Sequence, residues 1–358
     1  MRKVNDLHID NIQPLIPPVE LKQRFPLSDE SAELVYESRE TVKRIINRED
    51  PRILGIIGPC SIHDTRGALE YAHKLNELRE QVKDRIYIIM RVYFEKPRTT
   101  IGWRGLIVDP LLDGSYDIAL GLETARKTLL EITSLGLPAG SEMLDPYVPQ
   151  YIDDLVSWAA IGARTTESQT HRNLASGLSM PVGFKNGTSG NLELAVNAMQ
   201  SATHPASFIG IDPEGNTSVL HTTGNDVCHL ILRGGRGGPN YHEEDVENAE
   251  EMMRKAKLNP SVVVDCSHEN SGKKSPRQQR VLRSIIDQVS HGQPALSGFM
   301  LESNLFDGAQ KIPEDLSLLK YGVSVTDECV GWEETKKIVL QAYDKLENIG
   351  RAERNKAK

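Results

Sequence analysis

The sequence predicts an α/β protein built as a (β/α)8 TIM barrel, with an N-terminal extension and an inserted β-hairpin. Short apolar runs alternate with helical patterns, and about eight such units follow one another. Several of the runs are rich in Val, Ile and Leu without alternating polar residues. Strands of that kind are buried on both faces, and eight strand–helix units are the number that closes a barrel. We therefore expect a closed barrel rather than an open doubly wound sheet.

The N-terminal extension comprises residues 1–50 and precedes the first expected strand. It is rich in proline up to position 26 and then carries a helical pattern over 31–47. Because it does not fit the strand–helix repeat, we expect it to serve regulation or oligomerisation. The catalytic barrel is expected over 51–358.

Eight buried runs are expected to form the barrel strands. In chain order they cover 53–57, 86–92, 137–142, 158–164, 181–185, 229–233, 261–265 and 296–302. Helical patterns lie between or after them at 68–79, 122–135, 150–157, 192–200, 245–256, 278–289 and 333–348. The segment 206–222 indicates two short strands around a Pro-Glu-Gly-Asn turn, so we expect the inserted hairpin there.

The composition excludes several classes of protein. The chain has 358 residues, 39% of them hydrophobic, and a formal net charge of −8. A large core is therefore possible, and the acidic balance argues against nucleic-acid binding. No apolar run approaches the ~20 residues that a membrane span needs, and no signal-peptide core follows the N-terminus. Since the four cysteines form no CxxC pair, we expect a soluble cytoplasmic protein with reduced thiols.

The expected strand ends carry many cations for an acidic protein. In a (β/α)8 barrel these ends point into the active site. Six basic residues would therefore surround one cavity: Arg91, Lys96, Arg98, Arg164, Lys185 and Arg233. Because like charges repel, such a group is expected to bind anions, and Arg matches phosphate and carboxylate bidentately. The alternative is that each cation lies in a solvated surface salt bridge.

Four further residues near the strand ends have the chemistry of metal ligands. They offer one thiol, one imidazole and two carboxylates: Cys60, His268, Glu302 and Asp327. This mixed set suits a divalent transition metal, Mn²⁺, Fe²⁺, Co²⁺ or Zn²⁺, rather than Mg²⁺ or Ca²⁺. In the structural alternative, Cys60 is a small buried residue and His268 a hydrogen-bonded loop residue.

Four contiguous motifs carry a resemblance to a known family. They are Gly58-Pro-Cys-Ser-Ile-His63, Tyr93-Phe-Glu-Lys-Pro-Arg-Thr-Thr100, Ile161-Gly-Ala-Arg-Thr-Thr-Glu-Ser168 and Pro181-Val-Gly-Phe-Lys-Asn-Gly-Thr188. On these motifs the chain resembles the metal-dependent, feedback-regulated 3-deoxy-D-arabino-heptulosonate 7-phosphate (DAHP) synthases, over residues 7–346. The resemblance implies a transferase for the first step of the shikimate pathway, leading to aromatic amino acids. In that step phosphoenolpyruvate condenses with erythrose 4-phosphate and water to give DAHP and phosphate.

The resemblance also implies roles for individual residues. Metal ligands are expected at Cys60, His268, Glu302 and Asp327, with Asp265 supporting them. Phosphoenolpyruvate is expected to contact Arg91, Lys96, Glu142, Arg164, Lys185 and Arg233. Erythrose 4-phosphate is expected to contact Lys96, Pro97, Arg98 and Thr99. Catalytic roles are expected for Lys96, Glu142, Lys185, Cys60 and His268, with Glu142 and Lys185 positioning a water and Lys96 or a metal-bound water supplying a proton.

Feedback regulation is a further implication of the resemblance. Regulated members bind an aromatic amino acid with the N-terminal extension and the hairpin, across a subunit contact. The matching positions here are Asn5, Asp6, Pro149, Gln150, Leu174, Ser179, Phe208 and Gly210. Asp6 suits the ammonium group of an effector, and Gly210 leaves room for a para hydroxyl, so tyrosine is favoured over phenylalanine. A homo-oligomer, either a dimer or a homotetramer, is also implied.

Other functions stay open on the sequence. The related 3-deoxy-octulosonate 8-phosphate synthases condense arabinose 5-phosphate on a similar barrel, although the extension and the Lys-Pro-Arg-Thr-Thr run favour the four-carbon sugar. A metal-dependent aldolase would give no reason for so many anion-binding groups. A non-catalytic metal- or anion-binding barrel is expected to lack part of the cation or metal set, and none is lacking here.

Overall fold

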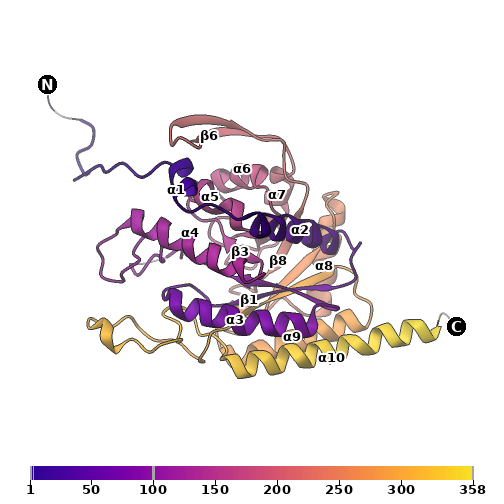
Figure 1. Cartoon of the computed structure of the whole chain (residues 1–358). Helices are drawn as coiled ribbons and strands as arrows, with labels where there is room; N and C mark the ends of the chain where they lie inside the picture. Colours follow the sequence, from indigo (N-terminus) through magenta and orange to yellow (C-terminus); the bar gives the residue numbers. More distant parts are fainter. Residues whose placement is uncertain (1, 3, 99–100, 357–358) are drawn as a thin grey trace.

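A closed barrel of eight parallel strands forms the centre of the molecule (Figure 1). The computed structural model describes residues 2, 4–98 and 101–356, with side chains up to residue 346. The barrel strands are β1 (Ile53–Gly58), β2 (Ile86–Arg91), β3 (Ala139–Glu142), β4 (Trp158–Ile161), β5 (Val182–Lys185), β8 (Cys228–Leu232), β9 (Val262–Asp265) and β10 (Leu296–Glu302). Every residue in them is buried, as expected for runs without polar alternation. The prediction of a (β/α)8 barrel is confirmed.

The barrel order follows the chain and closes where β10 pairs with β1. The register sets Gly58 beside Glu302, and Glu142 beside Ala160. Because all eight strands are parallel, their carboxyl ends meet at one edge of the barrel. The segments that follow these strands therefore share one end of the molecule.

Helices cover the outside of the barrel. They are α3 (Thr65–Val82), α4 (Ile118–Ser134), α5 (Pro149–Ile152), α6 (Gln169–Gly177), α7 (Glu193–Ala202), α8 (Glu243–Lys255), α9 (Gln278–Ser290) and α10 (Trp332–Lys356). Short 3-10 helices lie at Asp153–Leu155, His268–Asn270, Ser275–Arg277 and Leu316–Leu318. Among the described residues, no helix is both long enough and apolar enough to cross a membrane.

Two of the helices around the barrel differ from the sequence prediction. The helix expected over 150–157 is a single turn, α5, which continues as a 3-10 turn at Asp153–Leu155. The sequence did not predict α6, because its polar residues leave only Leu174, Ala175 and Ser176 buried. With only Leu174 and Ala175 as apolar residues, the segment has too few apolar side chains for a helical pattern to stand out.

The N-terminal extension contributes two helices, α1 (Pro18–Arg24) and α2 (Asp29–Ile46). The hydroxyl of Ser28 caps α2 by accepting from the Ser31 N–H at 3.2 Å. Val42, Ile45 and Ile46 of α2 belong to one buried cluster with inward-facing barrel residues. The Asn259 amide, which precedes β9, donates to Ile46 O at 2.9 Å. Helix α2 thus covers the amino ends of the strands, opposite the end where the strand-end side chains gather.

A β-hairpin of β6 (Ser207–Ile211) and β7 (Thr217–His221) is inserted between α7 and β8. Its turn reaches the extension, since Val19 N donates to Pro213 O at 2.8 Å. The predicted hairpin is therefore present, and it lies next to α1 (Figure 1).

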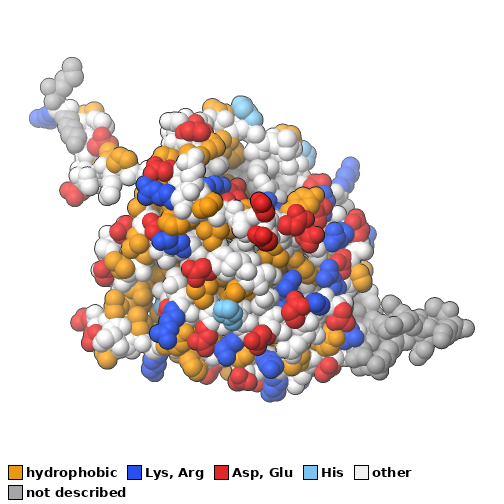
Figure 2. All heavy atoms as spheres, in the orientation of Figure 1, with side chains coloured by type: hydrophobic (Ala, Val, Ile, Leu, Met, Phe, Trp, Pro, Cys, Tyr) orange, Lys and Arg blue, Asp and Glu red, His pale blue; other side chains and the backbone are white. Residues whose placement is uncertain are grey.

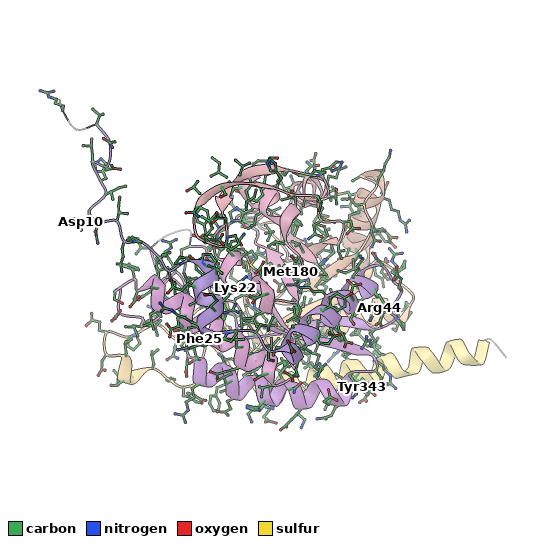
Figure 3. All side chains as sticks on the ribbon, turned by 45° about the horizontal axis from the view of Figure 1, so that its top comes forward. Asp10, Lys22, Phe25, Arg44, Met180 and Tyr343 are labelled. Atoms are coloured by element: carbon green, nitrogen blue, oxygen red, sulfur yellow. The ribbon has the colours of Figure 1, made fainter. Side chains whose placement is uncertain are left out.

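An extended arm precedes α1 and stands away from the barrel. Figure 2 shows this arm projecting from the body, with apolar side chains along it. Val4 is 83% exposed and Ile12 is 74% exposed. Asp10 lies on the arm, while Lys22 and Phe25 lie on the body (Figure 3). The arm thus leaves apolar surface uncovered in the single chain.

Candidate active site

The carboxyl ends of the barrel strands open into one cavity. The six cations expected at these ends all line it: Arg91, Lys96, Arg98, Arg164, Lys185 and Arg233. Glu142, His268 and Asp327 line the same cavity. Positive charge and possible metal ligands are therefore brought together at one place.

Arg91 ends β2, and its guanidinium is enclosed at the barrel mouth with the side chain 1% exposed. Its Nη2 donates to Glu302 Oε1 at 2.9 Å and to Cys60 O at 3.2 Å. The guanidinium carbon lies 3.5 Å from the centroid of the Tyr93 ring. Burial lowers the pKa of Arg91, but Tyr93 and Glu302 outweigh it, so the pKa is raised and the charge is kept. Within the described structure Nη1 has no protein partner, which leaves one donor for a ligand.

Lys185, Asp265 and His268 form a connected row of side chains. Lys185 Nζ lies 2.8 Å from Asp265 Oδ2, and the same oxygen lies 2.9 Å from His268 Nδ1. The Ser267 hydroxyl donates to Asp265 Oδ1 at 2.6 Å. Burial raises the pKa of Asp265, but His268 and Lys185 lower it by more, so this carboxylate stays ionised. With Nδ1 engaged, His268 directs Nε2 toward the other possible ligands.

The possible metal ligands gather around Cys60. Ligand atoms of Cys60, Glu302 and Asp327 all lie within 4.8 Å of one another. His268 is not part of that trio, although its Nε2 lies 3.9 Å from Glu302 Oε1. Lys96 Nζ lies 3.1 Å from Cys60 Sγ. One sulfur, one nitrogen and two carboxylates at these positions are a donor set that fits a transition metal.

Opposing charges set the protonation of this group. Burial, and then Glu302, raises the pKa of the Cys60 thiol. Burial also raises the pKa of Asp327, but Lys96 and His268 outweigh it and the net shift is downward. For Lys96, burial lowers the pKa while Cys60 and nearby carboxylates raise it by more. The group therefore contains an ionised carboxylate, and the protonation of the Lys96 amine is linked to that of the Cys60 thiol, since each charge favours the other.

Glu142 ends β3 and is directed into the cavity. Its side chain is buried, and in the described structure Oε1 has no protein partner. A Cβ added at Gly162 would lie 2.2 Å from that oxygen, so a larger residue there would push the carboxylate out of its present position. A buried oxygen without a partner is costly, so Oε1 is a natural acceptor for water or substrate.

Some cavity residues were not predicted. Gly162, Thr188, Lys273 and Thr326 also line the cavity. Lys273 comes from the segment after the 3-10 turn at His268–Asn270, where no strand pattern marks it. Neither a motif nor the spacing of apolar residues marks such positions in the sequence. They reach the cavity only through the folding of the loops.

The segment expected to contact the sugar phosphate lies partly on the cavity. Pro97 and Arg98 line it, and Arg98 Nε donates to Trp103 O at 2.8 Å. Thr99 lies outside the described residues, so its position is left as predicted.

The expected effector residues are distributed over several elements. Pro149 and Gln150 begin α5, Leu174 lies on α6, Ser179 follows α6, and Phe208 and Gly210 lie on β6. Asn5 and Asp6 lie on the exposed arm, away from the body (Figure 1). In the single chain the structure does not bring Asp6 to the others.

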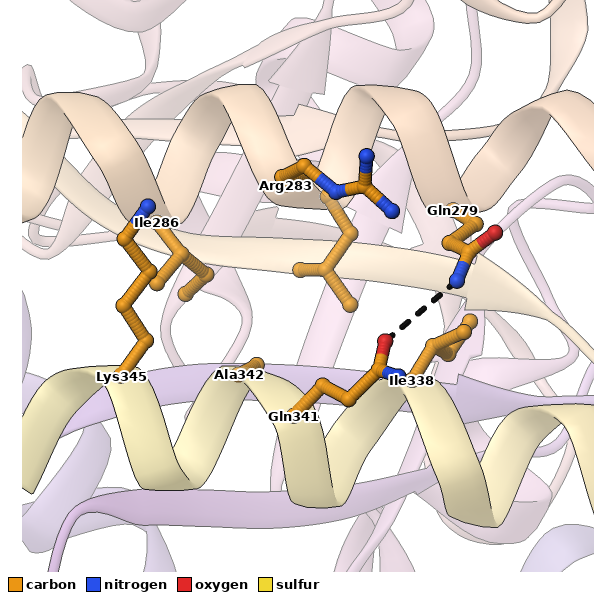
Figure 4. Close-up of a pocket in the computed structure, with 8 residues that line it drawn as sticks. Gln279, Arg283, Ile286, Ile338, Gln341, Ala342 and Lys345 are labelled. Carbon is orange, nitrogen blue, oxygen red and sulfur yellow. Dashed lines mark hydrogen bonds between the residues drawn. The ribbon is translucent and has the colours of Figure 1, made fainter.

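A second hollow lies between α9 and α10 (Figure 4). Its floor is apolar, and its rim carries Arg283 and Lys345, with a hydrogen bond between Gln279 and Gln341 at 3.3 Å. None of the strand-end residues lines it. The barrel mouth is therefore the candidate active site.

The fold and the cavity define a class of protein, a (β/α)8 barrel with a cation-lined cavity and a set of possible transition-metal ligands at its mouth. Comparison with known proteins makes the assignment specific, because the sequence model of the DAHP synthetase I family matches residues 24–340. The chain belongs to this family and is an enzyme of the transferase class.

Individual relatives are similar along nearly their whole length. The Tyr-sensitive phospho-2-dehydro-3-deoxyheptonate aldolase of Escherichia coli (strain K12) is 51% identical over 343 residues, covering 96% of each chain. The Phe-sensitive enzyme of the same organism is 48% identical, covering 94% of this chain and 96% of the relative. The structure of the phospho-2-dehydro-3-deoxyheptonate aldolase of Francisella tularensis SCHU S4 matches with a TM-score of 0.92 and 47% identity, covering 95% of this chain and 98% of that chain.

Proposed function

We propose that the chain condenses phosphoenolpyruvate with erythrose 4-phosphate and water, giving DAHP and phosphate as the first step of the shikimate pathway. The observation that carries this proposal is the cavity in which six cations surround Glu142 and a possible metal site. Two phosphate groups and one carboxylate account for that number of cations. Family membership supports the same reaction.

Phosphoenolpyruvate is proposed to lie against Arg91, Lys96, Arg164, Lys185 and Arg233. Arg91 offers the unpartnered Nη1, and Arg233 is a buried guanidinium on the same cavity. Lys185 is held in place by Asp265, which limits its motion when the substrate binds. These fixed cations orient the enol phosphate with little loss of side-chain entropy.

The chemistry needs a water placed at C2 and a proton at the sugar carbonyl oxygen. C3 of phosphoenolpyruvate bonds to the aldehyde carbon, C2 then takes water, and phosphate leaves from the resulting hemiketal. Glu142 Oε1 is proposed to accept a hydrogen bond from that water, with Lys185 on its other side. Lys96, kept charged by its surroundings, is proposed to hold the proton for the new hydroxyl.

The proposed metal ligands are Cys60, His268, Glu302 and Asp327, with Mn²⁺, Fe²⁺, Co²⁺ and Zn²⁺ as candidates. A bound ion would supply Lewis-acid polarisation of the aldehyde oxygen. Asp265 is proposed to hold the His268 ring in place through Nδ1.

Erythrose 4-phosphate is proposed to contact Lys96, Pro97, Arg98 and Thr99. The test is phosphate release from phosphoenolpyruvate by the metal-loaded enzyme, with either erythrose 4-phosphate or arabinose 5-phosphate. We expect release with the four-carbon sugar. Release with arabinose 5-phosphate alone would assign the sister reaction, and release with neither sugar would leave a binding protein.

Feedback inhibition by an aromatic amino acid is proposed, with tyrosine as the preferred effector. Some relatives are named Tyr-sensitive and others Phe-sensitive, so the names alone do not tell which amino acid is the effector here. Gly210 is buried, and a Cβ there would lie 2.6 Å from Leu220 Cδ1, so a larger residue requires Leu220 to move. Inhibition titrations with each amino acid test this, and stronger inhibition by phenylalanine would reverse the preference.

A homo-oligomer, either a dimer or a tetramer, is proposed from the uncovered apolar surface. Ile209 and Val219 are paired across the hairpin and are 72% and 61% exposed. The arm adds Val4 and Ile12. Light scattering of the full chain tests the proposal, and a monomer would refute it. The cytoplasmic location stays a prediction from the sequence.

A further inference from the structure

The segment after β2 that carries Lys96 is folded tightly on itself. Lys96 N donates to Arg104 O at 2.9 Å, and Ile107 N donates to Phe94 O at 3.4 Å. At Gly105 the φ angle is +109°, and a Cβ there would lie 2.1 Å from Phe94 O. These contacts hold the segment together, but none of them ties it to the neighbouring strand end that carries Glu142.

Glu95 makes that connection. Its side chain is 4% exposed, although it neighbours Lys96 and carries a carboxyl group. Glu95 Oε1 accepts a hydrogen bond from Asp145 N at 3.1 Å, and Asp145 follows Glu142 at the end of β3. In the described structure Glu95 Oε2 has no protein partner. Burying a carboxyl group has a large desolvation cost, so the burial of Glu95 indicates that this side chain has a structural or functional role.

His171 holds the same peptide group from its other side. His171 Nε2 lies 2.7 Å from Leu144 O, and because a carbonyl oxygen only accepts, Nε2 carries the hydrogen. His171 Nδ1 lies 2.9 Å from Ser168 Oγ, whose hydroxyl can donate to it. Leu144 O and Asp145 N belong to one peptide unit. Its carbonyl is therefore held from α6, and its N–H is held from the Lys96 segment.

We propose that Glu95 and His171 are positioning residues that fix Lys96 relative to Glu142 by holding the 144–145 peptide at both polar atoms. Neither side chain lines the cavity, so both act through Lys96 and Glu142. This inference rests on the proposed function, which assigns those two residues to the reaction. If Lys96 were displaced, the other cations of the cavity would stay in place. Loss of either positioning residue should therefore lower kcat more than it lowers the affinity for phosphoenolpyruvate.

The test uses variants that remove each hydrogen bond and variants that restore it. Glu95→Leu removes the acceptor, and His171→Phe removes the donor. Glu95→Gln keeps a side-chain oxygen at a similar distance, and His171→Gln keeps a side-chain N–H. His204→Phe is the matched control, since His204 Nδ1 also bonds a helix carbonyl, Gln200 O at 2.8 Å, away from the cavity. All variants are compared with wild type for kcat, phosphoenolpyruvate affinity at equilibrium and metal content.

Glu95→Leu and His171→Phe are expected to lower kcat about tenfold or more, since small misplacements of catalytic groups have such effects. Their affinity for phosphoenolpyruvate should fall by much less than kcat does, because Arg91, Arg164, Lys185 and Arg233 keep their places and only the Lys96 contact is disturbed. Glu95→Gln and His171→Gln should recover most of kcat, and His204→Phe should match wild type. Wild-type kcat in His171→Phe, or an equal loss in the control, overturns the proposal.

Two further measurements keep the test decisive. His171 is only partly buried, so His171→Phe decides the matter if Glu95→Leu does not fold. Hydrogen exchange over residues 143–147 should be faster in His171→Phe than in wild type. This readout needs no turnover, so unchanged exchange overturns the positioning role even if the proposed reaction itself proves wrong.

Discussion

Lys96 is the residue on which the proposed chemistry depends most closely. Its Nζ lies 3.0 Å from Cys60 O and 3.1 Å from Cys60 Sγ, and 5.9 Å from the centroid of the Tyr93 ring. Lys96→Met keeps the length of the side chain but removes the charge and the proton. We expect turnover to fall by about 10²-fold or more, which is the usual size of a lost acid–base group. Metal content should be unchanged, and near-normal turnover would exclude the assigned role.

Glu95 predicts a pH dependence of stability. Burial, followed by Asp145, raises the pKa of Glu95 from 4.5 to about 8; Glu142 adds to this, while the backbone N–H groups of Asp145 and Leu144 oppose it. The folded protein then binds this proton more tightly than the unfolded chain does. The stabilisation is present in full below pH 4.5 and is lost as the pH rises through about 8.

Glu95→Gln cannot lose this proton, so its stability should decline less than that of wild type between pH 4.5 and 8. Each unit of pKa difference corresponds to about 1.4 kcal/mol, and the full shift sets an upper bound. Denaturant unfolding of both proteins across this range measures the difference. Parallel curves would show that Glu95 does not titrate in this way.

The strand-end residues could be predicted from the sequence because parallel strands bring their carboxyl ends to one edge. That rule gathers Arg91, Glu142, Lys185 and Glu302 without any knowledge of the loops. Gly162 could not be predicted, because its importance lies in a close approach between β3 and β4. The link between Glu95 and His171 passes through a backbone peptide, and no sequence pattern reports such a contact.

At the scale of elements, Arg126 of α4 joins the N-terminal extension to the barrel. Its side chain is fully buried, donates to Phe25 O at 2.8 Å and to Tyr151 O at 2.9 Å, and makes a bidentate pair with Asp154. Arg126→Leu would leave two carbonyls and one carboxylate without their donor. Removing one partner of a fully buried pair costs roughly 3–5 kcal/mol. Because the Asp154 side chain is 26% exposed and lies 3.6 Å from Lys22, the loss should be at the lower end of that range.

Unfolding by denaturant should therefore show a loss of that order for Arg126→Leu. The matched control is Lys255→Leu, whose i,i+4 partner Glu251 lies on the exposed face of α8. Exposed i,i+4 pairs contribute about 0.3–0.5 kcal/mol, so this variant should be close to wild type. Equal losses in the two variants would mean that Arg126 does not anchor the extension.

The helices and strands could be predicted where their burial left a clear pattern of apolar residues in the sequence. The barrel strands are buried throughout, so continuous apolar runs reveal them. Helix α6 has mostly polar residues and was missed, and α5 stops after one turn where the chain passes into a 3-10 helix. Helix α1 was also missed: its residues after the prolines have good helix propensity, but seven residues are too few to show an apolar face.

The whole molecule places its additions and its active site on separate parts of the barrel. Helix α2 covers the amino ends of the strands, and the cavity lies at their carboxyl ends. The number of strand–helix units favoured a closed barrel, but buried strands alone did not decide it, since an open doubly wound sheet also covers both faces of its strands. The course of the arm was not predictable, because apolar residues such as Val4 and Ile12 stay largely exposed in the single chain.

The central claim is a condensation that needs both the metal site and the sugar phosphate. The most direct measurement is phosphate release from phosphoenolpyruvate by chelator-treated enzyme, with and without Mn²⁺ and with and without erythrose 4-phosphate. The account predicts release only when both are added. Release without the sugar, or release that is indifferent to the metal, would contradict it.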